Sequence, residues 1–158
     1  MKITFIGTGS IIPSPKNNTS PVRSYSAIYV EAAGTTFLFD IGPGTLTKLQ
    51  NIGIDTRIHP EHLLISHYHI DHCQDYPGMV KGRLFNITTD RTEKGKHISV
   101  YGPQELKRFT SDLFTKVGRW EYMKLDLHAL EILTLTEIDY GHVARSDNWK
   151  ITCLPVRH

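Results

Sequence analysis

Three histidines and one aspartate fall within six residues, directly after a short apolar run. The run covers residues 63–65 and is typical of a buried strand. The segment that follows reads His67-Tyr68-His69-Ile70-Asp71-His72. On extended backbone the side chains of an H-x-H pair project from the same side, so His67 and His69 can converge on one ion. Asp71 and His72 follow after the chain has turned, and we expect them to reach a second ion beside the first.

The donor types indicate which metals would bind there. Imidazole suits zinc, iron and related metals, and a carboxylate adds charge for a second divalent ion. Two ions about 3.5–4 Å apart can activate a water and polarise a phosphoryl or carbonyl oxygen. We therefore expect that two divalent ions bind there and that the metal is zinc, with manganese or iron as the alternatives. A histidine-rich polar loop without metal is the alternative interpretation, and four potential ligands at this spacing after a buried strand disfavour it.

The composition is that of one globular domain. The chain has 158 residues, of which 39% are hydrophobic and 22% charged, and these values exclude a coiled coil, a collagen-like chain and a disordered tail. Two cysteines, Cys73 and Cys153, are too few for a disulfide scaffold or a zinc site of four cysteines. A net charge of +2 does not by itself indicate a nucleic-acid partner.

The first residues do not resemble a targeting segment. The longest uncharged run lies between Lys2 and Lys16, and it is interrupted by Gly7, Gly9 and Pro13. It lacks the continuous apolar core of a signal peptide and is too short to span a bilayer. We expect a cytoplasmic, reduced protein without a membrane partner.

The hydrophobic pattern predicts strands that alternate with helices. The expected strands cover residues 3–7, 26–30, 35–40, 63–65, 98–101, 131–138 and 150–156. We expect one helix over residues 45–52, and a second that has Pro103 in its first turn and ends at Gly118. The polar residues 86–96 predict a surface loop. This alternation indicates an α/β layered protein.

Two further candidates have simpler explanations. Gly7-Thr8-Gly9 after a strand is similar to the start of a dinucleotide fingerprint, but the third glycine is absent and Pro13 and Pro15 oppose the helix that would hold a pyrophosphate. A tight turn is the better interpretation. Cys73 could be a ligand because it follows His72, although a free cysteine is more often a small buried apolar residue.

The segment 67–72 resembles the H-x-H-x-D-H signature of the metallo-β-lactamase superfamily. Four other stretches resemble its ribonuclease Z branch, which includes the tRNA 3′-processing endonuclease and related phosphodiesterases. These stretches are Phe5-Ile6-Gly7-Thr8-Gly9-Ser10, Asn18-Thr19-Ser20, Phe37-Leu38-Phe39-Asp40 and Val100-Tyr101-Gly102-Pro103. One departure is Gly42-Pro43-Gly44-Thr45-Leu46, where that branch usually has Gly-Glu-Gly-Thr-Gln.

The resemblance implies roles for six residues. The first metal would be bound by His67, His69 and His158, and the second by Asp71 and His72. Asp71 would also accept a proton from the attacking water. Asp40 would orient the metal site without touching an ion.

The resemblance also implies a fold and a function. We expect an αββα sandwich of which residues 1–158 form the N-terminal part, with only the first sheet and its helices. A second sheet, a metal-bridging aspartate and a last histidine would lie beyond His158. The implied activity is that of a dinuclear metal-dependent hydrolase acting through a metal-activated hydroxide. It would be either a phosphodiesterase or a ribonuclease Z-like endoribonuclease for precursor tRNA. The resemblance also implies that the complete protein is a homodimer. The alternatives are a hydrolase of another ester, such as a lactone or sulfate, and a non-catalytic metal-binding half-domain.

Overall fold

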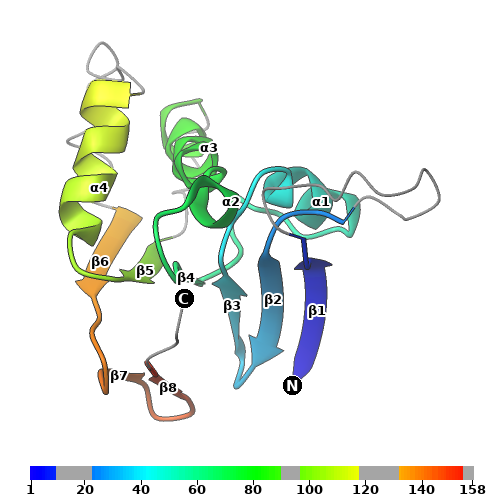
Figure 1. The fold of residues 1–158 in the computed structure, drawn as a ribbon. Coiled ribbons are helices and arrows are strands. Elements are labelled where there is room, and N and C mark those ends of the chain that lie inside the picture. Colours follow the sequence, from blue (N-terminus) through cyan, green and yellow to red (C-terminus); the bar gives the residue numbers. More distant parts are fainter. Residues whose placement is uncertain (10–22, 90–96, 118–131, 155–158) are drawn as a thin grey trace, which may run out of the picture.

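Six strands form one sheet in the order of the sequence, β1-β2-β3-β4-β5-β6 (Figure 1). The computed structural model describes residues 1–9, 23–89, 97–117 and 132–154. The strands of the sheet are β1 (Lys2–Gly7), β2 (Ala27–Ala32), β3 (Thr35–Phe39), β4 (His62–Leu64), β5 (Ile98–Gly102) and β6 (Leu133–Glu137). Strands β1 to β3 are antiparallel, and β3 to β6 run parallel. Two more strands, β7 (Val143–Arg145) and β8 (Lys150–Thr152), form a separate hairpin.

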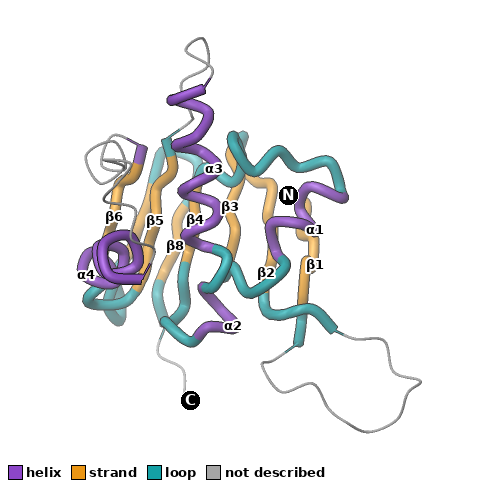
Figure 2. The backbone as a smooth tube through the Cα atoms, turned by 90° about the horizontal axis from the view of Figure 1, so that it is seen from above, coloured by secondary structure: helices purple, strands orange, loops and turns teal. Residues whose placement is uncertain are grey.

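The helices connect the parallel strands and lie together on one face of the sheet (Figure 2). They are α1 (Thr45–Asn51), α2 (Ile70–Cys73), α3 (Tyr76–Thr89), α4 (Leu106–Asp112) and a π-helical turn, η1 (Leu113–Val117). Within the described ranges, the structure contains no helix long and apolar enough to span a bilayer. The α/β class and the single layer of helices on the first sheet are as the sequence predicts.

Alternation along the strands divides the apolar residues between the two faces of the sheet. Leu38 and Leu63 pack against the helices in the main core, together with Leu49, Tyr76, Met79 and Leu106. Phe37 and Leu64, which alternate with them, point to the opposite face and form a second cluster with Tyr101. Because side chains alternate across a strand, residues adjacent in the chain supply both layers.

The β7–β8 hairpin packs on that opposite face. Trp149 places its ring edge-on to Phe37 at 5.4 Å and to His62 at 4.9 Å between centroids. Since the helices lie on the other face of the sheet, this hairpin is the described element that packs on the second cluster. The hairpin covers the middle of the sheet, whereas Ile3 and Phe5 on β1 remain 50% and 66% exposed.

Several boundaries differ from those that the sequence predicts. Helix α3, which the pattern did not reveal, extends through Thr89, so the predicted surface loop 86–96 is wrong for its first four residues and otherwise lies outside the described residues. Pro103 is not in the first turn of α4, because Glu105 adopts a positive φ of 72° and the helix begins at Leu106. The last strand ends at Thr152, and residues 155–158 are outside the described part.

Candidate metal centre

Parallel pairing of β3 and β4 brings the two strand ends of the site together. Phe39 pairs with Leu64, and the backbone N–H of Asp40 donates to the carbonyl of Leu64 at 2.8 Å. Asp40 therefore follows β3 at the same edge of the sheet where the segment 67–72 follows β4. Asp40 has a positive φ of 59°, a conformation that aspartate tolerates better than most residues.

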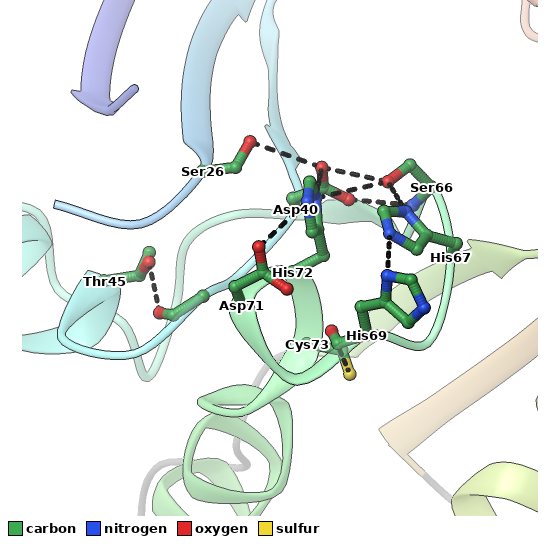
Figure 3. Close-up of polar contacts among 10 residues, drawn as sticks. Ser26, Asp40, Thr45, Ser66, His67, His69, Asp71, His72 and Cys73 are labelled. Atoms are coloured by element: carbon green, nitrogen blue, oxygen red, sulfur yellow. Dashed lines mark hydrogen bonds and ion pairs between the residues drawn. The ribbon is translucent and has the colours of Figure 1, made fainter. Parts of the chain in front are cut away.

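His67 and His69 face each other on the loop after β4 (Figure 3). The Nε2 atom of His67 lies 3.0 Å from the Nδ1 atom of His69, and the ring centroids are 4.6 Å apart. Two nitrogens that are each about 2.0–2.1 Å from a tetrahedral zinc ion lie roughly 3.4 Å apart. The two imidazoles therefore need only a small movement to share one ion.

Asp71 and His72 form a second pair at the start of α2. The Nε2 atom of His72 lies 3.6 Å from Oδ2 of Asp71, a separation that suits two ligands of one ion. The other ring nitrogen, Nδ1, lies 2.6 Å from Oδ2 of Asp40 and donates its proton to that carboxylate. This bond assigns the proton to Nδ1 and leaves the Nε2 lone pair facing Asp71, which is the arrangement that metal-binding histidines use.

Ser66 connects the two pairs through Asp40. Its backbone N–H donates to Oδ1 of Asp40 at 2.8 Å, and its hydroxyl donates to Oδ2 at 3.0 Å. The same hydroxyl lies 3.0 Å from Nδ1 of His67, so it can accept the proton of that ring. The hydroxyl of Ser26 lies 3.5 Å from Oδ2 of Asp40. Neither serine is part of the predicted site, although Ser66 lies in the sequence directly between the strand and the first histidine.

The donors come as two pairs rather than as one closed cluster. Among the described residues, no group of three or more histidine, cysteine, aspartate or glutamate side chains gathers in a geometry that could hold an ion. His158, the predicted third ligand of the first metal, lies outside the described residues. The structure thus brings together His67, His69, Asp71, His72 and Asp40, and the complete ligand set stays a prediction.

A close backbone contact fixes α2 against the end of β3. The N–H of Ile41 donates to the carbonyl of His72 at 2.7 Å, and the N–H of Asp75 donates to the carbonyl of Ile41 at 3.1 Å. A Cβ atom on Gly42 would lie 2.1 Å from the carbonyl oxygen of Asp71 and 2.6 Å from Cβ of Tyr25. Only glycine permits this approach, which carries Asp71 and His72 to Asp40.

Cys73 and two other histidines contact groups outside the two donor pairs. Cys73 is buried, and its thiol donates to the carbonyl of His69 at 3.2 Å rather than facing the imidazoles. Burial raises the pKa of this thiol to about 11. His59 and His97 contact the threonines Thr36 and Thr134.

The chain is similar to ribonuclease Z along its whole length. It is 29% identical over 158 residues to the ribonuclease Z of Methanothermobacter thermautotrophicus and 32% identical over 162 residues to that of Limosilactobacillus reuteri. These matches cover 100% and 99% of the chain but 45% and 48% of the relatives, so the chain spans about half the length of the curated relatives it matches. No model of a protein family matches the chain.

Solved structures with a similar fold also match the chain over about half of their own length. Human tRNase Z, short form, superposes with a TM-score of 0.59 and 28% identity, over 87% of this chain and 44% of that one. The metallo-β-lactamase fold protein YhfI from Bacillus subtilis superposes with a TM-score of 0.63 and 16% identity, over 92% of this chain and 49% of that one. The fold is thus that of about half of a metallo-β-lactamase fold protein, as the sequence resemblance implied.

Proposed function

We propose that the protein containing this chain is a dinuclear metal-dependent hydrolase that cleaves phosphodiesters, and that it acts as a ribonuclease Z-like endoribonuclease on precursor tRNA. The observation that carries this proposal is the arrangement of His67/His69 and Asp71/His72 as two donor pairs at the end of one strand. The similarity to ribonuclease Z over the whole chain supports the substrate class.

The donors fit divalent ions of the zinc type. His67 and His69 would hold the first ion with His158, and Asp71 and His72 would hold the second. When bound, two such ions lower the pKa of a coordinated water and neutralise charge on the phosphoryl oxygens. Asp71 would accept the proton of the attacking water, and Asp40 would keep His72 in the tautomer that presents Nε2.

We also propose that residues 1–158 form the N-terminal part of a single metallo-β-lactamase domain, and that the protein is a cytoplasmic homodimer. The 45% and 48% coverage of the relatives supports the first statement. Light scattering on the purified full-length protein tests the dimer, which a monomer mass at micromolar concentration would exclude.

The function is tested on the purified full-length protein. Metal content after reconstitution should reach about two equivalents per chain, and the protein should cleave bis-p-nitrophenyl phosphate and the 3′ trailer of a precursor tRNA. His67→Ala should lose most of the first metal and at least about 100-fold in kcat, whereas His97→Ala, whose ring contacts Thr134, serves as a matched control.

Two results would change this conclusion. Less than half an equivalent of any transition metal would contradict a metal-dependent hydrolase. Activity on a lactone or an aryl sulfate, with none on either phosphodiester, would assign the site to another ester.

A further inference from the structure

Tyr68 separates His67 from His69 in the chain, and its side chain is directed away from them. On extended backbone, the middle residue of a triplet points opposite to its neighbours. The Tyr68 hydroxyl donates to the carbonyl of Pro103 at 2.7 Å and lies 3.2 Å from the carbonyl of Gln104. Both acceptors belong to the turn between β5 and α4, which is more than thirty residues away along the chain.

The ring of Tyr68 also packs against an aromatic side chain. It stacks on Phe109 of α4, with centroids 4.4 Å apart and planes inclined by 26°. Phe109 lies nearly parallel to Tyr76 of α3, with centroids 6.5 Å apart, and the hydroxyl of Tyr76 bonds to Thr110 at 3.1 Å. Tyr68 therefore joins the histidine loop to a stack that includes two helices.

The loop needs such an anchor because residues 66–69 belong to neither a strand nor a helix. The last sheet bond before it is donated by the N–H of Ile65 to the carbonyl of Tyr101 at 2.8 Å. Beyond that point, the backbone N–H of His72 donates to the carbonyl of His69 at 2.9 Å at the far end of the loop, and side-chain contacts hold the residues between. Tyr68 is fixed on one side of the loop, so the two imidazoles are presented together on the other.

We infer that Tyr68 is a positioning residue for the metal centre, holding the His67–His69 loop against the β5–α4 turn so that the two ring nitrogens face each other before an ion binds. This inference rests on the proposed function for its purpose, whereas the contacts of Tyr68 with the β5–α4 turn and Phe109 do not. An anchor of this kind lowers the cost of ordering the ligands when the metal binds.

The test compares two tyrosines in the full-length protein. Tyr68→Phe removes the hydroxyl but keeps the ring, and Tyr76→Phe does the same at the far end of the same stack, where the hydroxyl contacts Thr110 rather than the β5–α4 turn. In metal-free protein, a nuclear Overhauser contact between the rings of His67 and His69 should be present in the wild type, weak in Tyr68→Phe and retained in Tyr76→Phe. Zn²⁺ affinity, measured by chelator competition, should fall roughly tenfold in Tyr68→Phe and less than twofold in Tyr76→Phe.

The two readouts separate this inference from the proposed function. A wild type that binds no Zn²⁺ would contradict the function, and the ring contact would still decide the role of Tyr68. Phe109→Leu, which removes the stack and keeps the hydroxyl bonds, should weaken the ring contact in the same direction. The inference is overturned if Tyr68→Phe keeps the ring contact, or if both tyrosine variants change it equally with equal losses of melting temperature.

Discussion

The Nδ1 atom of His72 lies 2.6 Å from the Oδ2 atom of Asp40, although 32 residues separate them in the chain. The contact forms because β3 and β4 are parallel neighbours whose ends meet at one edge of the sheet. Asp40 is buried, and it also accepts two hydrogen bonds from Ser66. One carboxylate thus fixes the tautomer of His72 and the start of the loop that carries His67.

The Asp40 carboxylate provides the first prediction. Asp40→Asn keeps the size of the side chain but replaces an acceptor oxygen with an amide, so the proton on Nδ1 of His72 is no longer secured. We expect Zn²⁺ affinity to fall about 10–100-fold, as is typical when the partner of a metal-binding histidine is lost. Isothermal titration calorimetry measures the Zn²⁺ affinity of each variant. Asp112→Asn on the surface of α4, which removes an ion pair with Lys116, is the control, and equal affinities in the two variants would contradict the role of Asp40.

The backbone contact at Gly42 provides the second prediction. In Gly42→Ala the new methyl group would lie 2.1 Å from the carbonyl oxygen of Asp71, so the α2 segment must move. We expect a loss of about 1–3 kcal/mol in the free energy of unfolding, measured with urea, and a loss of the second metal, for which Asp71 and His72 are the proposed ligands. Gly82→Ala in helix α3 is the matched control, because no atom of the described residues, apart from the helix's own backbone and the two chain neighbours, lies within 4 Å of a Cβ atom added there. This variant should stabilise the protein by about 0.5–1 kcal/mol. A Gly42→Ala variant as stable as Gly82→Ala would exclude this account.

The two cysteines provide the third prediction. Cys73 is 4% exposed, and burial raises its pKa to about 11, whereas Cys153 is partly exposed. At pH 8 only about one Cys73 thiol in a thousand is ionised, so iodoacetamide should label Cys153 at least tenfold faster in the native protein. Peptide mass spectrometry measures the labelling, and both residues should react after unfolding in urea. Faster labelling of Cys73 would show that α2 opens in solution.

The sequence predicted the local parts of the site because their signals are local. Four potential ligands fall within six residues, and the strand before them is a short apolar run, so spacing alone led to the candidates His67, His69, Asp71 and His72. Asp40 was found only through the resemblance to a known family. The bonds of Ser66 and Ser26 to Asp40 depend on which strands are neighbours, and a single sequence does not contain that information.

The difference between local signals and long-range packing also explains the errors in the predicted fold. Helix α3 was missed because Pro77, Gly78 and Gly82 interrupt its pattern, although Tyr76, Met79, Val80 and Leu84 are buried at helical spacing. Pro77 is compatible with a first helical turn, and burial against the sheet outweighs the low helix propensity of glycine. Strand β7 has three residues, too few for a period of two to be recognised, whereas β8 lies at the start of the predicted strand over residues 150–156.

His62 provides the last prediction, which concerns stability against pH. Its ring stacks on Phe37 at 4.9 Å and lies edge-on to Trp149 of the β7–β8 hairpin at the same centroid distance. Burial lowers the pKa of His62 below its ordinary value of 6.5; Glu61 opposes this shift and His97 adds to it.

Because the folded pKa of His62 is lowered, the unfolded chain takes up the proton first on acidification. The contribution of neutral His62 is fully present above pH 6.5 and is lost as pH falls from about 6.5 toward the lower folded pKa. We expect the melting temperature of the metal-free protein to fall between pH 7.5 and 5.5, and His62→Phe, which keeps the aromatic packing, to reduce that fall. His59→Phe is the control for removing a histidine outside this cluster. If the melting temperatures of His62→Phe and the wild type fall in parallel across this range, protonation of His62 does not cause the loss of stability at low pH.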